Sequence, residues 1–227
     1  MLKALLTDID GTLTGPDRRV HTGSVELIRS LSDRGVRIVF ASGNSPCFMD
    51  AFCRMIGNDG TFIAENGGVF RIGFDGELVV NGDQAVVKRA LSVVQEHFRA
   101  QGTELSLFSP NYRYADQAFA RTVPVDEVRD LLAGYPVQVL DTGFAIHIQS
   151  PGVNKGTALA ALAPRLGLTP EDFLAIGDSC NDLQMLAAAG IAATPKNGHP
   201  ELKAIAHYSA EKEYGDGFVE AVRKYFG

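Results

Sequence analysis

The sequence predicts an α/β fold with three layers and a parallel sheet, into which a smaller α+β domain is inserted. Three observations lead to this prediction. Short apolar runs alternate with helical patterns over residues 1–80, which is typical of a parallel sheet covered by helices. Over residues 81–151 the order changes to helix, strand, strand, repeated twice. The first alternation returns over residues 152–227, so we expect one discontinuous core domain and one inserted domain.

The elements before residue 81 follow from periodicity and from turn-forming residues. Val25, Ile28 and Leu31 share one face of the first expected helix. The second expected helix opens with Pro46 and closes with Gly57, an asymmetry typical of helices. Short apolar runs bounded by turns indicate the strands. The expected elements are strands at 3–7, 36–42 and 61–68, helices at 22–35 and 46–57, and a hairpin at 69–80.

The same reasoning gives the elements of the other two segments. In the insertion we expect helices at 84–98 and 125–135 and strands at 104–108, 112–122, 137–141 and 144–150. In the last segment we expect helices at 156–167, 181–190 and 216–226 and strands at 173–177 and 191–194. The order of elements in the insertion indicates an antiparallel sheet with helices on one face.

The composition excludes several classes of protein. Of the 227 residues, 45% are hydrophobic and 21% are charged, as expected for a globular protein with a full core. A net charge of −6 argues against nucleic acid or an anionic membrane as a partner. The three cysteines form no CxxC pair, which favours a reducing compartment. No apolar run reaches the roughly eighteen residues of a membrane span. We therefore expect a cytoplasmic protein, either a monomer or a homodimer.

Two acids, Asp8 and Asp10, follow the first expected strand. Their spacing places both on one side of the chain as it leaves the strand, and ligands bind at the carboxyl ends of parallel strands in open sheets. A solvated turn explains most isolated Asp-x-Asp pairs. Gly11 and Thr12 extend this pair to "DIDGT", which average residue frequencies produce in only about a few per thousand chains of this length. We therefore interpret the pair as part of a site.

A second pair of acids, Asp178 and Asp182, follows the expected strand at 173–177. Acids in this position can simply cap a helix and interact with its dipole. A parallel sheet would, however, bring this strand end beside the first one, so that about four carboxylates share one crevice. Such a cluster requires a bound cation or raised pKa values. Because all the ligand atoms are oxygens, Mg²⁺ is the cation we expect.

Two further segments can bind an anion. Ser42, Gly43 and Asn44 end the second expected strand, where a hydroxyl and free backbone N–H groups suit a phosphate oxygen, although a plain turn has the same composition. Lys155 begins a helix after Asn154, a good N-cap. A cation there opposes the helix dipole. Lys155 is therefore either a solvated surface residue or the partner of an anion at the helix N-terminus.

Together these segments resemble the four sequence signatures of the haloacid dehalogenase-like superfamily. "DIDGT" is similar to its first motif, Ser42 to its second, Lys155 to its third and "GDSCND" to its fourth, in the right order along the chain. The resemblance implies a Rossmann-like core. An α+β insertion between the second and third motifs resembles the sugar-phosphatase branch. The segments "SGN", "AENGG" and "VNKG" are most similar to archaeal-type phosphoglycolate phosphatases.

The resemblance also implies roles for these residues. Asp8 would attack phosphorus and form an aspartyl-phosphate. Asp10 would protonate the leaving group and then activate water. The implied ligands of Mg²⁺ are Asp8, Asp10, Asp178 and, directly or through water, Asp182. The implied ligands of the phosphoryl group are Ser42, Gly43, Asn44 and Lys155.

The resemblance therefore implies a Mg²⁺-dependent phosphomonoesterase, with 2-phosphoglycolate as the favoured substrate. Three alternatives stay open at this point. The first is a phosphatase for another small sugar phosphate or for a nucleotide. The second is a phosphomutase, which returns the phosphoryl group to its substrate instead of transferring it to water. The third is a non-catalytic binding protein on the same fold.

The remaining polar candidates give weaker signals. The carboxylate of phosphoglycolate needs a donor, and Arg113 and Arg121 are the basic residues of the insertion that we would test first, although a solvated strand position is the more common explanation for each. The histidines have no metal-ligand spacing. His147 lies in a strand pattern and could face the surface of the insertion, and Cys180 is expected to pack against its neighbours.

Overall fold

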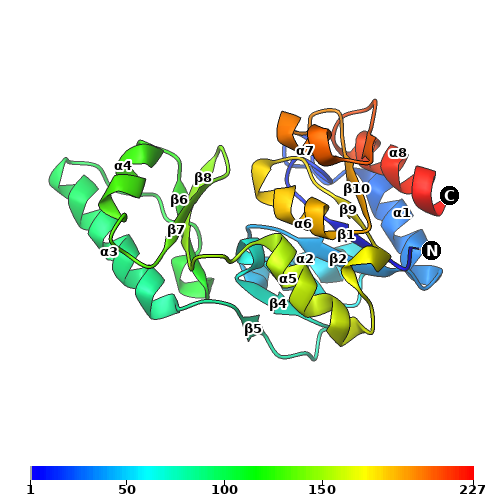
Figure 1. Ribbon diagram of the computed structural model, residues 1–227, viewed down its shortest axis with the longest axis horizontal. Helices are drawn as coiled ribbons and strands as arrows, with labels where there is room; N and C mark the ends of the chain where they lie inside the picture. Colours follow the sequence, from blue (N-terminus) through cyan, green and yellow to red (C-terminus); the bar gives the residue numbers. More distant parts are fainter. Residues whose placement is uncertain (1) are drawn as a thin grey trace.

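The structure, a computed structural model, describes residues 2–227 and contains two separate sheets (Figure 1). The large sheet has eight strands in the order β11-β10-β9-β1-β2-β3-β4-β5. These strands are β1 (Ala4–Thr7), β2 (Arg37–Ala41), β3 (Phe62–Ala64), β4 (Val69–Arg71), β5 (Val79–Val80), β9 (Phe173–Ile176), β10 (Ile191–Thr194) and β11 (Tyr208–Ser209). The strands from β11 to β3 run parallel, whereas β4 and β5 form the expected hairpin and are antiparallel. The sheet is therefore mixed and mostly parallel.

Helices cover both faces of the large sheet. They are α1 (Thr22–Asp33), α2 (Pro46–Ile56), α5 (Lys155–Leu162), α6 (Leu183–Ala188), α7 (Pro200–Ile205) and α8 (Tyr214–Phe226). Buried apolar side chains form two core clusters in this part of the molecule. The first includes side chains of α1, α2 and α8, and the second includes side chains of α5, α6 and α7. Leu5 of β1 belongs to the first cluster and Leu6 to the second, because successive strand residues point to opposite faces. This confirms the predicted three-layer α/β fold.

The small sheet contains three antiparallel strands in the order β6-β8-β7. They are β6 (Asp116–Ala120), β7 (Gln138–Asp141) and β8 (Ala145–Gln149), and two helices, α3 (Gln84–Ala100) and α4 (Val125–Leu131), accompany them. Apolar side chains of both helices form a third core cluster with Phe119 and Ile146 of this sheet. In Figure 1, α3 and α4 lie on the side of the small sheet that faces away from the large sheet. The other side of the small sheet therefore faces the large one.

The structure differs from the sequence-based expectation in a few elements. The strand expected at 104–108 does not form, and only Leu107 makes an isolated bridge, to Phe119. Leu105 and Leu107 pack into the third core cluster instead, which explains why the segment is apolar. Periodicity does not predict α7 or β11, because both are too short to carry a repeat. Within residues 2–227, no helix combines the length and the apolar character that crossing a membrane requires.

Candidate active site

The candidate site lies where three parallel strands end side by side. β1 pairs with β2 and with β9, so that Thr7 is opposite Phe40 on one side and Ile176 on the other. Asp8 directly follows β1, Ser42 directly follows β2, and Asp178 comes two residues after β9. The carboxyl ends of neighbouring parallel strands meet at one edge, which is where open α/β sheets bind ligands.

Lys155 joins two of the predicted acids. Its Nζ donates to Asp8 Oδ1 and to Asp182 Oδ1, both at 2.6 Å. The Lys155 side chain is 0% exposed, so the solvated surface position considered above is excluded. Burial by itself lowers the pKa of the ammonium, but the charges of Asp182 and Asp8 outweigh burial and raise the pKa above its usual value. The helix starts at Lys155 because Asn154 and Thr157 form a capping box in front of it.

Asp182 uses both carboxylate oxygens within the protein. Oδ1 accepts from Lys155, and Oδ2 accepts from the backbone N–H groups of Asp178 and Ser179 at 3.0 and 3.1 Å. These bonds fix Asp182 as the support of the Lys155 ammonium. Its assignment as a metal ligand stays a prediction, and its oxygens are more fully engaged than those of Asp8.

Three acids are close enough to share a cation. Asp8, Asp178 and Asp182 each offer a carboxylate oxygen within 4.8 Å of the others. Burial raises the pKa of Asp8 well above its usual value, although the charge of Lys155 opposes this. Burial, followed by the charge of Asp182, raises the pKa of Asp178 to about 7. Crowded, desolvated carboxylates of this kind fit a hard divalent cation such as Mg²⁺, which would relieve both causes.

Gly11 is required by the position of Asp178. Its φ is +89°, and a Cβ built there would lie 2.4 Å from Asp178 Oδ2. Thr12 then donates from Oγ1 to Asp178 Oδ1 at 2.9 Å. The segment "DIDGT" therefore holds the second acidic strand end as well as carrying the first two acids.

Asp10 belongs to a different cluster of polar groups. Its Oδ2 accepts from Asn44 Nδ2 at 2.9 Å, and the same nitrogen donates to Ser42 Oγ at 2.9 Å. Ser42 Oγ also accepts from the backbone N–H of Asn44 at 3.1 Å, so its hydroxyl proton is free to bind a ligand. Asn44 thus links the predicted general acid to the predicted phosphate loop.

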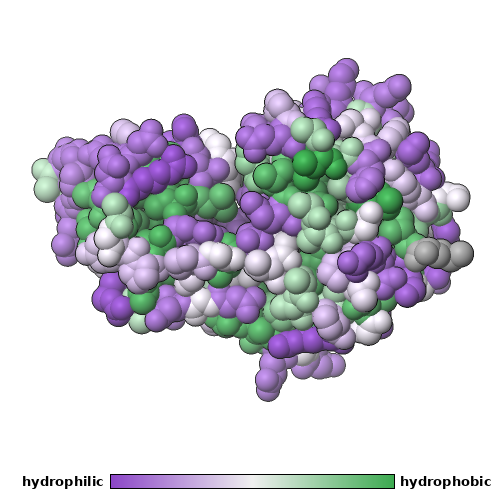
Figure 2. Space-filling model, viewed as in Figure 1, coloured by the Kyte–Doolittle hydropathy of each residue, from purple (hydrophilic) through white to green (hydrophobic). Residues whose placement is uncertain are grey.

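A pocket of about 200 Å³ joins these groups to the small sheet. Figure 2 shows a notch in the surface between the two halves of the molecule. The large-sheet side of the pocket contributes Asp8, Asp10, Arg18, Ser42, Gly43, Asn44, Ser45, Phe48, Ser179 and Asn181. The small-sheet side contributes Phe108, Ser109, Arg113, Thr142, Phe144, Ala145 and His147. The predicted phosphate site and a wall of the small sheet therefore enclose one small ligand-sized space.

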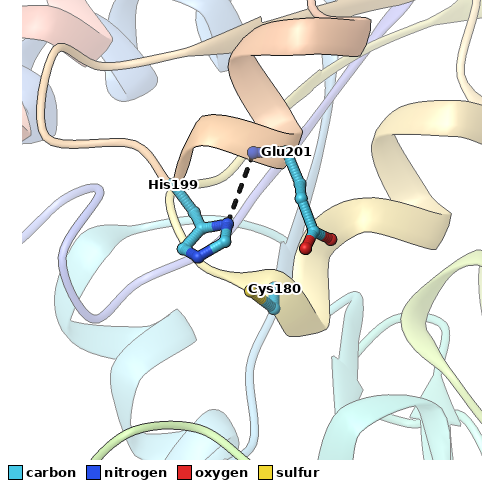
Figure 3. A group of neighbouring side chains, drawn as sticks. All are labelled: Cys180, His199 and Glu201. Carbon is cyan, nitrogen blue, oxygen red and sulfur yellow. Dashed lines mark hydrogen bonds between the residues drawn. The ribbon is translucent and has the colours of Figure 1, made fainter.

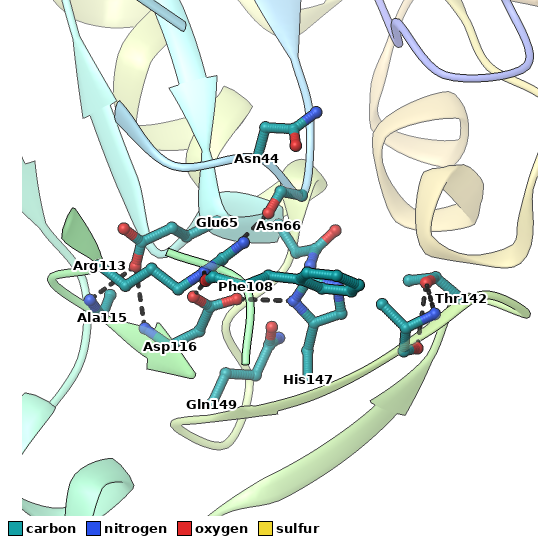
Figure 4. Close-up of polar contacts among 12 residues, drawn as sticks. Asn44, Glu65, Asn66, Phe108, Arg113, Ala115, Asp116, Thr142, His147 and Gln149 are labelled. Atoms are coloured by element: carbon teal, nitrogen blue, oxygen red, sulfur yellow. Dashed lines mark hydrogen bonds and ion pairs between the residues drawn. The ribbon is translucent and has the colours of Figure 1, made fainter. Parts of the chain in front are cut away.

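A network of charged side chains forms that wall (Figure 4). Asp116 accepts from Arg113 Nη1 at 2.6 Å and bonds to His147 Nδ1 at 2.8 Å. Burial alone would raise the pKa of Asp116, but the hydrogen bond to His147 and the charge of Arg113 hold it below its usual value. Arg121, the other arginine considered above, pairs with Asp141 and does not line the pocket. The structure therefore distinguishes the two arginines, which sequence spacing does not.

Sequence reasoning missed Glu65, which attaches the small-sheet segment to the large sheet. Its carboxylate accepts from the backbone N–H groups of Tyr114, Ala115 and Asp116 at 2.7 to 3.2 Å. Burial, followed by the charge of Asp116, raises the pKa of Glu65 to about 7. The signal in the sequence is the "ENGG" turn after β3, in which Gly67 has φ +101° and a Cβ would lie 2.1 Å from Asn154 O.

Another group of side chains lies beside the site (Figure 3). Cys180, His199 and Glu201 each offer a ligand atom within 4.8 Å of the others, although their sequence spacing does not indicate a metal site. All three residues are exposed. His199 Nδ1 accepts from the backbone N–H of Glu201 at 3.3 Å, which ties that nitrogen to the start of α7. We assign no ligand to this surface group.

The comparison with known proteins decides the family. The haloacid dehalogenase-like hydrolase family matches residues 5–130 and 125–222, nearly the whole chain. This chain belongs to the haloacid dehalogenase-like hydrolases. The predicted family and the predicted enzyme class, a phosphatase of haloacid dehalogenase type, are therefore confirmed.

Curated relatives and solved structures of similar proteins match this chain over nearly its full length. A phosphoglycolate phosphatase of Methanoculleus marisnigri is 53% identical over 100% of this chain and 97% of its own. That of Methanothermobacter thermautotrophicus is 38% identical over 100% of both chains. The crystal structure of Thermoplasma acidophilum 0175 has a TM-score of 0.87 at 26% identity and covers 99% of this chain and 98% of its own. A haloacid dehalogenase-like hydrolase from B. subtilis has the same fold, with a TM-score of 0.81 at 17% identity over 100% of both chains.

Proposed function

We propose that this hydrolase is a Mg²⁺-dependent phosphomonoesterase that converts 2-phosphoglycolate to glycolate and phosphate through an aspartyl-phosphate. The observation that carries the proposal is the buried contact of 2.6 Å between Lys155 Nζ and Asp8 Oδ1. This contact holds one oxygen of Asp8, and Oδ2 makes no hydrogen bond to another residue of 2–227. Oδ2 is therefore the nucleophile. The choice of substrate is supported by full-length relatives that are phosphoglycolate phosphatases.

The chemistry follows from the placement of the side chains. Asp8 Oδ2 attacks phosphorus, the bond from phosphorus to the ester oxygen breaks, and Asp10 gives its proton to the departing alkoxide. Asp10 then takes a proton from water, which attacks the aspartyl-phosphate, releases inorganic phosphate and restores the Asp8 carboxylate. Asn44 orients Asp10 for both proton transfers. Ser42 Oγ and Lys155 Nζ bind the phosphoryl oxygens as they move.

A divalent cation fits the acidic group. Asp8 and Asp178 would hold it, together with Asp10 and, directly or through water, Asp182. When bound, Mg²⁺ neutralises part of the charge on the transferring phosphoryl group. Thr12 and Gly11 keep Asp178 in place for this role. Asp8 and Asp178 would then lose both the cost of burying their charges and part of their mutual repulsion.

We further propose that residues 1–80 and 152–227 form the catalytic core and that residues 81–151 form a cap domain. The cap closes one side of the pocket with Phe108, Arg113, Phe144 and His147. Enclosure of this kind excludes water from the aspartyl-phosphate until the leaving group has departed. The cap residues also face the part of the substrate that does not react.

The test of the proposed function is release of inorganic phosphate from a panel of phosphomonoesters, ranked by kcat/KM, with Mg²⁺ and with EDTA. We expect 2-phosphoglycolate to rank first and EDTA to abolish release. In ¹⁸O-water the released phosphate should carry label, which distinguishes hydrolysis from phosphomutase transfer. Asp8→Asn should abolish turnover, because an amide cannot form the acyl phosphate. Near-normal activity of purified Asp8→Asn would overturn the proposal.

A further inference from the structure

We propose that Arg113 and His147 together form the site that binds the carboxylate of the substrate. The proposal rests on the proposed function, because it concerns the part of a phosphomonoester that does not react. It assigns the selection of an anionic substrate to two named side chains of the cap. Both line the same pocket as Asp8 and Ser42.

Each residue has a side-chain nitrogen that the rest of the protein leaves free. The two side chains are only 4% exposed, yet Arg113 Nη2 and His147 Nε2 make no hydrogen bond within residues 2–227. The fully buried side-chain polar atoms without a partner in that range are Arg71 Nε, Gln117 Nε2 and Gln149 Oε1. Arg113 Nη2 and His147 Nε2 are not among them, so both atoms keep some exposed surface, and both residues line the pocket.

The other side-chain nitrogens of these residues are fixed by the protein. Arg113 Nε donates to Phe108 O at 2.7 Å, and Nη1 donates to Asp116 Oδ1 at 2.6 Å. His147 Nδ1 lies 2.8 Å from Asp116 Oδ2, a carboxylate oxygen that accepts, and 3.2 Å from Asn66 Nδ2. Nε2 is therefore the ring nitrogen that is left for a ligand. Asp116 thus orients both side chains (Figure 4). Glu65 holds the backbone of Asp116 in turn, so the whole wall is preorganised.

Both residues contact the phosphate loop. Arg113 Nη1 donates to Gly43 O at 3.1 Å, and a Cβ built on Gly43 would lie 3.3 Å from His147 Cε1. Gly43 directly follows Ser42, a predicted phosphate ligand. An anion bound by Arg113 and His147 is therefore close to the phosphoryl group. In phosphoglycolate a single methylene group joins the ester oxygen to the carboxylate, which matches this short separation.

The charges also favour a carboxylate. Arg113 carries a positive charge at the pocket, and Asp116 lies between its guanidinium and the His147 ring. A carboxylate brings a negative charge and two acceptor oxygens to Arg113 Nη2 and His147 Nε2, whereas a neutral hydroxyl group brings no charge. Arg18 is the other cation that lines the pocket, but it is exposed and its guanidinium lies over the Phe144 ring, with a separation of 5.1 Å. It is therefore not preorganised in the same way.

The test compares two substrates that differ only at this end, 2-phosphoglycolate and 2-hydroxyethyl phosphate. The main variant is His147→Asn, whose amide keeps a donor near Asp116 and removes Nε2. We expect kcat/KM for phosphoglycolate to fall about 10- to 100-fold, mainly through KM, as for the loss of a charge-assisted hydrogen bond. The value for hydroxyethyl phosphate should change little. Arg121→Ala is the matched control and should leave kcat/KM unchanged for both substrates.

A second variant and a binding measurement keep the proposal decidable. Arg113→Lys should show the same selective loss, because one ammonium cannot serve Asp116, Gly43 and a carboxylate together. Equal losses for both substrates in His147→Asn would overturn the proposal in favour of a structural role. A selective loss in Arg18→Ala, with His147→Asn unaffected, would overturn it in favour of Arg18. If the wild-type enzyme hydrolysed neither substrate, the proposed function would fail. The carboxylate site would then be tested by calorimetry, and equal dissociation constants for the two compounds would overturn it.

Discussion

Lys155 Nζ lies 2.6 Å from Asp8 Oδ1, and the residues that form this contact are separated by 147 positions in the chain. The contact is buried, and the same ammonium also binds Asp182. A buried charge is tolerated only when it is paired and hydrogen-bonded. The acid–lysine–acid arrangement therefore supports the fold and the proposed chemistry together, and removing any of its members should change both.

The first prediction concerns the lysine of this arrangement. Lys155→Met keeps most of the side-chain volume but leaves two buried carboxylates without their cation. We expect a loss of stability of about 3–5 kcal/mol, reduced where Asp8 takes up a proton, and a fall in kcat/KM of about 10²–10³-fold. A thermal melt paired with kcat/KM at saturating Mg²⁺ measures both. Lys88→Met, on an exposed face of α3, is the control, and a stable, fully active Lys155→Met would contradict the arrangement.

The second prediction concerns the proposed general acid. The amide oxygen of Asp10→Asn can still accept the hydrogen bond from Asn44 Nδ2, but the amide cannot protonate the leaving group. We expect kcat for 2-phosphoglycolate to fall about 10²–10⁴-fold, and the fall for p-nitrophenyl phosphate to be smaller, because that leaving group needs no protonation. Steady-state kinetics with both substrates measures the difference. Asp126→Asn, at an exposed position of α4, should change neither value. Equal losses for the two substrates would remove Asp10 from the acid role.

The third prediction concerns metal removal. The pKa of Asp178 is raised to about 7 in the folded protein. The contribution of this carboxyl group to stability is therefore fully present below its pKa in the unfolded chain and is lost as pH rises through about 7. At about pH 8 in EDTA, Asp178→Asn should therefore melt at a higher temperature than the wild type. Mg²⁺ should raise the melting temperature of the wild type more than that of the variant. A variant that melts lower than the wild type in EDTA would show that the ionised Asp178 is not destabilising without metal.

The fourth prediction concerns Glu65, which holds the cap segment. Its pKa is raised from 4.5 to about 7, so its contribution to stability is complete below pH 4.5 and disappears as pH rises through about 7. This shift corresponds to at most about 3 kcal/mol. The free energy of unfolding of the wild type minus that of Glu65→Gln should therefore be larger at about pH 5 than at about pH 8. Urea unfolding at the two pH values measures this difference, and a difference independent of pH would contradict the raised pKa.

Much of the fold follows from patterns within short segments. Apart from α7 and β11, the strands of the large sheet and the helices that cover it lie within a few residues of their expected positions, because periodicity and turn residues act locally. The failure at 104–108 has the same origin, since an apolar run that packs into the third core cluster and forms only one isolated bridge looks like a strand in sequence. The antiparallel edge of the sheet also follows from the hairpin signal at 69–80.

The residues that leave the strands at the carboxyl edge of the large sheet can be predicted from the sequence alone. Asp8, Ser42 and Asp178 are placed there by strand ends, and parallel pairing brings strand ends together whatever their distance in the chain. How these groups connect to residues 81–151 follows only from the packing of the folded chain. Arg113 and Arg121 look equivalent in sequence, yet one lines the pocket and the other pairs with Asp141 at the surface. That choice depends on Glu65 binding the backbone of residues 114–116. Such a contact joins segments that no local period relates, so only the packing of the whole chain determines it.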